Sequence, residues 1–358
     1  MRIAINTGGG DAPGLNAAIR AATLAALKRG WEVFGIENGY GSIYTDEPFT
    51  KLDAKSVRGI TLQGGTILGT ANRGNPFDMP YQKEDGSWGT RDVSDHLIEK
   101  FEEYNIDALV AIGGDGSMRI AHKLIQKGVN VVGIPKTIDN DIYGCDVTLG
   151  FDTAIDIATG AIDRITTTAE SHDRLMVVEV MGRYAGWIAL YSGIASSSDV
   201  ILLPEIPFSY DSIVNKINER ESKGRNYTMI VAAEGAREKG GELTTKGKSV
   251  GQAVQLGGIG KLVADELSER TGKESRSVVL GHLQRGGSPS TYDRLISLRF
   301  GAAAIRCVQA KDFNKIVVLK DNQLTSIPIS DIVNKTKGVP LNSDTVQTAR
   351  DIGICLGD

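Results

Sequence analysis

Short apolar runs that end in a glycine-rich or polar turn recur along this chain, and they limit its possible folds more than any other feature. Residues 3–6 lead into TGGGDAPG, residues 108–112 into GGDGS, and residues 131–134 into PKTIDND. Each run has the length and composition of a buried strand. Residues 15–28 have helical periodicity between a Pro-Gly start and an Arg-Gly end. This alternation of strands and helices predicts βαβ units around a parallel sheet.

A second series of candidate strands follows the first. Its members are residues 175–180, 200–203, 229–233, 277–280 and 316–319. Since 358 residues exceed the usual size of one hydrophobic core, we expect this series to form a second α/β domain. Residues 238–251 are rich in Lys, Gly and Thr, which predicts an exposed loop.

Composition narrows the class of protein. The net charge is −4 without a run of like charges, which argues against nucleic acid or an anionic membrane as the main partner. No apolar run approaches the ~18 residues that cross a bilayer, and the first residues reach a glycine turn too soon for a signal peptide. Three scattered cysteines, Cys145, Cys307 and Cys355, predict reduced thiols. We therefore expect a cytoplasmic protein.

The two glycine-rich turns are candidate phosphate sites. In an open α/β sheet, ligands bind at the carboxyl ends of the strands, where helix N-termini attract phosphate oxygens. Glycine-rich turns also serve simply as tight corners, so each signal is weak alone. The segment IPKTIDND, residues 134–141, adds a lysine, a hydroxyl, a carboxamide and two carboxylates at a third strand end.

Five motifs occur in a fixed order: GGGDAPGLNAAIR, GGDGS, PKTIDND, MGRYAGW and GHLQRGGSPS. Together they make the chain resemble the 6-phosphofructokinases over residues 3 to about 310. The resemblance implies an α/β fold with two similar three-layer domains, largely parallel sheets, and an active site in the cleft between them. Residues 1–150, plus roughly 285–335, would bind the phosphoryl donor. Residues 151–284, plus roughly 336–358, would bind a sugar phosphate.

The resemblance also assigns the catalytic residues. Asp139 matches the base that accepts the proton of the sugar's 1-hydroxyl, and Thr137 matches a residue that holds the transferring phosphoryl group. Arg183, in MGRYAG, would spread the charge of that group, which suits a planar guanidinium. Asp115 and Asp141 would supply oxygen ligands for a Mg²⁺ ion that bridges the phosphates of ATP.

Further positions match the donor site. They are Gly9, Gly10, Tyr40, Arg73, Asp115, Gly116 and Ser117. Gly116 and Lys136 occupy the two positions that track the donor in this family. A glycine at 116 leaves room for ATP, whereas lysine at 136 is typical of members that use pyrophosphate. We expect ATP to be the donor, with pyrophosphate as the alternative.

The sugar phosphate would meet residues from several motifs. They are Thr137, Asp139, Arg174, Met181, Gly182, Arg183, Glu234, Arg276, His282 and Arg285. In the family, two arginines of this set reach in from a neighbouring subunit, and we assign that role to Arg174 and Arg276. A complete site then requires a homo-oligomer, a tetramer or a dimer. Sedoheptulose 7-phosphate, which carries a similar hydroxyl, remains a possible second acceptor.

Two other interpretations stay open at this stage. GGDG after a strand is also typical of NAD kinases and lipid kinases, although those families leave PKTIDND and GHLQRGG unexplained. The second interpretation is a catalytically silent sensor of sugar phosphate or nucleotide. Such a protein would have no need of the full constellation, and Asp115, Thr137, Asp139, Asp141 and Arg183 are all present.

Overall fold

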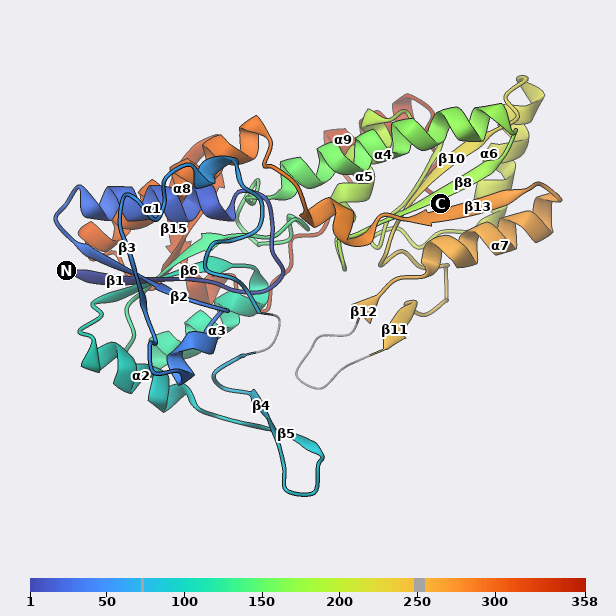
Figure 1. Ribbon diagram of the computed structural model, residues 1–358. Coiled ribbons are helices and arrows are strands. Elements are labelled where there is room, and N and C mark those ends of the chain that lie inside the picture. The colour runs from blue at the N-terminus through green and yellow to red at the C-terminus, as the bar shows by residue number, and fades with distance from the viewer. Residues whose placement is uncertain (72–73, 248–254) are drawn as a thin grey trace.

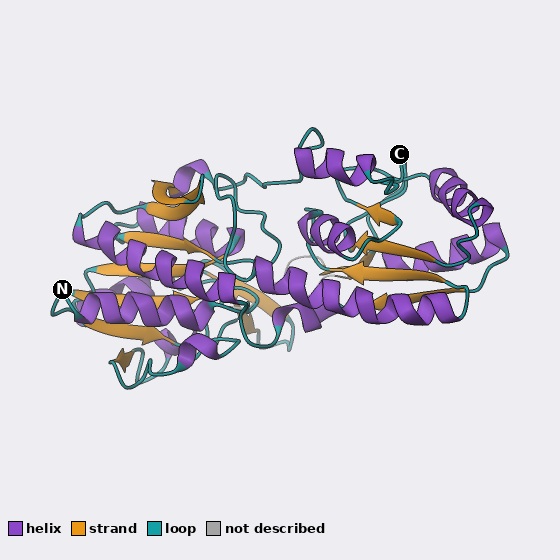
Figure 2. Ribbon diagram, turned by 90° about the horizontal axis from the view of Figure 1, so that it is seen from above, coloured by secondary structure: helices purple, strands orange, loops and turns teal. Residues whose placement is uncertain are grey.

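The protein was analysed as a computed structural model, which describes residues 1–71, 74–247 and 255–358. Two sheets lie side by side along the long dimension of the molecule (Figure 1). Helices cover both faces of each sheet, and Figure 2 shows the two groups from above. The predicted α/β class with two three-layer domains is confirmed.

The first sheet has seven strands, mostly parallel. In spatial order they are β15 (Gln323–Pro328), β14 (Lys315–Lys320), β7 (Val131–Pro135), β6 (Ala108–Gly113), β1 (Arg2–Thr7), β2 (Glu32–Ile36) and β3 (Thr50–Leu52). Only β15 and β3, the two edge strands, pair antiparallel with their neighbours. One face carries α1 (Leu15–Leu27) and α8 (Thr291–Gln309), and the other carries α2 (Ser94–Glu103) and α3 (Asp115–Gln126) (Figure 1).

The second sheet has four strands, all parallel. In spatial order they are β13 (Ser275–Val279), β8 (Leu175–Val180), β10 (Thr228–Ala233) and β9 (Val200–Leu202). Successive residues of β8 alternate between two cores. One core contains residues of α4 (Phe151–Ser171), α5 (Trp187–Ala195) and α9 (Asp344–Asp351), and the other contains residues of α6 (Tyr210–Ser222) and α7 (Ile259–Thr271).

One predicted strand belongs elsewhere than expected. Residues 316–319 are part of β14, which pairs with β7 of the first sheet through Lys315 and Ile316. Their assignment to the second series was therefore wrong, whereas the family resemblance groups them with residues 1–150. An apolar run reveals a buried strand, but it carries no signal for which sheet the strand joins.

Two short hairpins complete the description. β4 (Met79–Gln82) pairs with β5 (Trp88–Arg91), and β11 (Thr245–Gly247) pairs with β12 (Gln255–Leu256). The predicted loop at 238–251 thus contains a strand at 245–247, and residues 248–251 lie outside the described residues. The remaining 3-10 turns are η1 (Gly41–Tyr44), η2 (Ile60–Leu62), η3 (Gly281–Arg285) and η4 (Ile329–Asp331). No described helix is long and apolar enough to cross a membrane.

Candidate active site

Residues 136–141, which follow β7, form a buried polar segment. Asp139 is only 4% exposed, and its backbone N–H donates to Thr137 Oγ1 at 3.1 Å. Thr148 fixes the segment through two hydrogen bonds. Its hydroxyl donates to the Thr137 carbonyl at 2.7 Å, and its N–H donates to Asn140 Oδ1 at 3.1 Å. The predicted base therefore sits on a braced backbone.

Asp139 has spare hydrogen-bonding capacity. Its Oδ1 is buried and has no hydrogen-bond partner among the described residues. A buried acceptor without a partner is costly, so native proteins keep such groups mainly where another molecule or water completes them. Asp139 Oδ1 is thus available to a bound hydroxyl.

The GGDGS turn packs against this segment. Gly114 precedes α3, and a Cβ atom there would lie 3.3 Å from the Lys136 carbonyl oxygen. Asp115, in the first turn of α3, forms an ion pair with Arg119. Gly116 faces open space, since a Cβ atom there would find only Arg119 Nη2 within 4 Å, at 3.9 Å. The turn after β6 and the polar segment after β7 therefore lie in contact.

Acidic side chains gather at this meeting point. Burial, together with the negative charges of Asp139 and Asp115, raises the pKa of Asp141 to about 7, against a smaller opposing effect of Arg183. The Asp139 and Asp115 carboxylates are therefore close enough to Asp141 to repel its negative charge. The described residues contain no group of three or more side chains that could hold a metal without further ligands. Asp115 and Asp141 fit a cation that also takes oxygens from a bound phosphate or water.

The first glycine turn is held by Lys136. Its buried Nζ donates to the Gly8 carbonyl at 2.7 Å and also bonds the Gly10 carbonyl. Burial and the nearby Arg285 lower the pKa of Lys136 to about 7. Ser117, a predicted donor-site residue, packs under the same turn, because a Cβ at Gly8 would lie 2.6 Å from its Oγ.

Tyr40 and Arg73 are the remaining predicted side chains of the donor site. Tyr40 is 5% exposed, and its side chain packs in the core of the first sheet. Arg73 lies outside the described residues.

The MGR motif forms a sharp turn after β8. Gly182 has φ of +139°, and Arg183 has φ of +51°, a region that side chains rarely adopt. A Cβ at Gly182 would lie 2.5 Å from the Ala185 carbonyl oxygen, so only glycine fits. Glu234 fixes the turn by accepting the Arg183 N–H at 3.0 Å, and burial with the negative charge of Asp139 raises the pKa of Glu234 to about 7.

The HLQR segment lies in η3, beside the MGR turn. The fully buried Gln284 accepts the Met181 N–H at 3.3 Å, which joins these two predicted sugar-binding motifs. His282 is exposed. Arg285 Nη1 donates to the Asp11 carbonyl at 3.1 Å, so this guanidinium reaches from a predicted sugar-binding motif to the first glycine turn.

Arg174 and Arg276 lie close together. Both pair with Glu274, Arg174 through Nε at 2.8 Å. The two arginines hold the pKa of Glu274 below its usual value. The pair therefore forms one partly exposed basic group, a geometry that suits presentation to another molecule.

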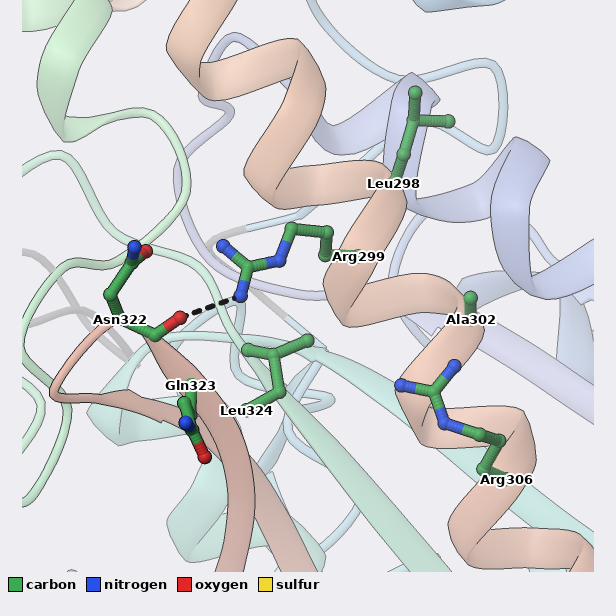
Figure 3. Close-up of a pocket in the computed structure, with 7 residues that line it drawn as sticks. All are labelled: Leu298, Arg299, Ala302, Arg306, Asn322, Gln323 and Leu324. Carbon is green, nitrogen blue, oxygen red and sulfur yellow. Dashed lines mark hydrogen bonds between the residues drawn. The ribbon is translucent and has the colours of Figure 1, made fainter.

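A surface hollow of about 530 Å3 lies between α8 and β15 (Figure 3). Its lining residues are Leu298, Arg299, Ala302, Arg306, Asn322, Gln323 and Leu324. None of them is a predicted site residue.

Comparison with known proteins agrees with this geometry. The family model described as phosphofructokinase matches residues 2–308. This chain belongs to the phosphofructokinase family. It is 49% identical to the ATP-dependent 6-phosphofructokinase 2 of Clostridium perfringens, covering 100% of this chain and 98% of that protein.

Two further relatives of this phosphofructokinase family member are informative. The chain is 47% identical to the pyrophosphate–fructose 6-phosphate 1-phosphotransferase of Amycolatopsis methanolica, with 95% of this chain and 96% of that one covered. The structure of phosphofructokinase from Saccharomyces cerevisiae matches with a TM-score of 0.77 and 30% identity, over 99% of this chain and 47% of the yeast chain. This chain thus spans about half the length of the yeast protein.

Sequence reasoning missed two residues that link the predicted site motifs of this family member. Gln284 joins the two predicted sugar-binding motifs, and the Asp11 carbonyl accepts a hydrogen bond from Arg285. Both lie inside motifs already singled out, QRGG and GGGDAPG, so their positions were visible. Their partners lie 103 and 274 residues away in the chain, and no local pattern reveals such contacts.

Proposed function

We propose that this protein is a 6-phosphofructokinase that transfers the γ-phosphoryl group of ATP to the 1-hydroxyl of fructose 6-phosphate, a glycolytic reaction. The observation that carries this proposal is Asp139. It is a nearly buried carboxylate with one unpartnered oxygen, held beside Thr137 at a strand end where two other carboxylates converge. A base in this setting accepts a proton from a bound hydroxyl.

The residues of the segment divide the chemistry. Asp139 takes the proton of the sugar's 1-hydroxyl while the hydroxyl oxygen attacks the γ-phosphorus of ATP. The bond between the γ-phosphorus and the bridging oxygen breaks, which releases ADP. Thr137 Oγ1 positions the transferring group. The Arg183 guanidinium spreads the negative charge of the transferring phosphoryl group, and stabilising that charge is the main requirement of phosphoryl transfer.

Asp115 and Asp141 would hold Mg²⁺. When bound, the ion neutralises donor phosphates beside the carboxylates. Burial, and then the charges of Asp139 and Asp115, raise the pKa of Asp141, and this supports the role because a bound cation would stabilise the buried carboxylate.

ATP is favoured as the donor by the open space at Gly116, which leaves room beyond the β-phosphate. Pyrophosphate is the alternative, supported by Lys136 and by the printed name of the Amycolatopsis relative. Lys136 bonds the carbonyls of Gly8 and Gly10, so we assign it to shaping the donor turn rather than to selecting one donor.

The sugar phosphate is assigned to Met181, Gly182, Glu234, His282 and Arg285 from this chain. Arg174 and Arg276, paired with Glu274 on the surface, would complete the 6-phosphate site of a neighbouring copy. The protein would therefore act as a cytoplasmic homo-oligomer, a tetramer or a dimer. Light scattering coupled to gel filtration measures the oligomer, and a monomer with full activity would contradict this assignment.

The test of function is a coupled assay of the purified protein with fructose 6-phosphate and either MgATP or Mg-pyrophosphate. We expect a much higher kcat/KM with ATP. The reverse ranking would make the protein the pyrophosphate enzyme, and inactivity with both donors would refute the proposal. Sedoheptulose 7-phosphate, run in parallel, tests the breadth of the acceptor site.

A further inference from the structure

Asp293 is a fully buried carboxylate that the proposed mechanism does not use. It lies in the first turn of α8 and is 0% exposed. Its Oδ1 accepts the Gly150 N–H at 2.8 Å, and its Oδ2 accepts the Thr153 N–H at 2.8 Å and the Thr153 hydroxyl at 2.5 Å. Both partners belong to the start of α4. A residue of the first domain thus holds a helix of the second.

The start of α4 lacks a cap of its own. Gly150 is its N-cap residue, with φ of +96° and no side chain to accept an N–H. The first N–H groups of a helix need acceptors, and the helix dipole favours a negative charge there. Asp293, from another part of the chain, supplies both the acceptor oxygens and the negative charge.

The arrangement is reciprocal. Ser290, the N-cap of α8, accepts the Asp293 N–H at 3.1 Å and donates its hydroxyl to Asp152 of α4 at 2.6 Å. The Ser290 N–H in turn donates to Thr153 Oγ1 at 3.0 Å. Since α8 packs in the core of the first sheet and α4 in a core of the second, this cluster joins the two domains.

The joint lies next to both halves of the active site. Gly150 lies two residues after Thr148, whose hydroxyl and N–H hold the segment that carries Asp139. Ser290 ends the stretch that begins with His282 and Arg285 in η3. Fixing Gly150 to Asp293 therefore fixes the base-bearing segment relative to the sugar-phosphate segment.

We propose that Asp293 is a positioning residue for phosphoryl transfer, which sets the alignment of Asp139 with the sugar's 1-hydroxyl through the shared start of α4 and α8. This inference rests on the proposed function. Asp293 contacts neither substrate, so its effect falls on the transition state rather than on binding. A misplacement of about 1 Å costs roughly 100-fold in rate.

The experiment compares Asp293→Asn and Thr153→Val with a control, Ser343→Ala. Asparagine keeps the shape but has one acceptor oxygen, and valine removes only the hydroxyl at the joint. Ser343 caps α9 by accepting the Val346 N–H at 3.3 Å, so its loss destabilises a helix outside the joint. We expect Asp293→Asn to lower kcat about 10- to 100-fold at 25 °C with both KM values within about threefold, and Thr153→Val to have a smaller effect in the same direction. Ser343→Ala should lower Tm but retain kcat.

A second measurement does not depend on activity. Amide hydrogen exchange in residues 137–149 should accelerate in Asp293→Asn and stay unchanged in Ser343→Ala. Wild-type kcat in both joint variants, or a loss expressed only in KM, would overturn the inference while leaving the proposed function intact. A wild-type protein inactive with fructose 6-phosphate would instead refute the proposed function, and the exchange data would still decide whether Asp293 braces the segment.

Discussion

Substitution of Gly116 by aspartate should separate the two donors. Gly116 lies in the first turn of α3 with ordinary backbone angles, and an added Cβ would meet only Arg119 Nη2, at 3.9 Å. The new side chain therefore fits without disturbing the fold. It would enter the space that the ATP α-phosphate and nucleoside require, and which pyrophosphate does not reach.

The magnitude follows from the charges. Two unit charges ~4 Å apart interact by about 4 kcal/mol at an effective dielectric constant of ~20. Arg119 already pairs with Asp115 and would offset part of this repulsion. A net loss near 2 kcal/mol is then a sensible expectation, equivalent to roughly a 30-fold lower kcat/KM with ATP. Activity with pyrophosphate should change by less than about threefold.

The assay is the coupled reaction with each donor, on wild type, Gly116→Asp and a matched Gly116→Ala. Alanine adds the Cβ without the charge, so it should remain within about threefold of wild type with ATP. Equal losses with both donors in Gly116→Asp would refute the reasoning, because the substitution would then act through the fold or the metal site. If Gly116→Ala lost as much activity with ATP as Gly116→Asp, the loss would come from replacing glycine itself and not from the added charge.

Three other variants test the site. Asp139→Asn should lower kcat by about 10²- to 10⁴-fold with modest changes in KM, and a loss under about tenfold in the coupled assay would remove Asp139 as the base. Because the folded pKa of Glu234 is raised to about 7, its contribution to stability is complete below its ordinary pKa of about 4.5 and is lost as the pH rises through 7. Glu234→Gln should therefore show a smaller fall in Tm between pH 5 and pH 8 than wild type, and an identical fall would contradict this. Lys136→Met removes the hydrogen bonds from Nζ to the Gly8 and Gly10 carbonyls, worth roughly 0.5 to 1.5 kcal/mol each for a neutral amine and more for a charged one. The KM for either donor should therefore rise about tenfold, and an unchanged donor KM would count against its role in the first glycine turn.

Much of the fold could be predicted because buried parallel strands are continuous apolar runs. The expected strand at 108–112 is β6, Ala108–Gly113, and the expected helix at 15–28 is α1, Leu15–Leu27. β15 escaped prediction because it is a partly exposed edge strand with a mixed pattern. The strand at 277–280 begins two residues earlier than expected, at Ser275, since polar residues open it.

The site could be predicted only as far as its motifs are local. Thr137, Asp139 and Asp141 share one short segment, so their proximity needs no knowledge of the fold. The contacts of Asp293 with Gly150 and of Arg285 with Asp11 cross 143 and 274 residues. Such pairings depend on how the two sheets are placed, which hydrophobic periodicity does not encode.

Lys136 shows what the structure adds to the question of the donor. The family resemblance associates lysine at this position with pyrophosphate use, yet Lys136 Nζ bonds the carbonyls of Gly8 and Gly10. A residue that shapes the first glycine turn acts on any donor whose phosphates meet that turn. The free space at Gly116 matters only to a donor that extends beyond two phosphates. Donor choice should therefore depend more on Gly116 than on Lys136, so a lysine at 136 is compatible with ATP.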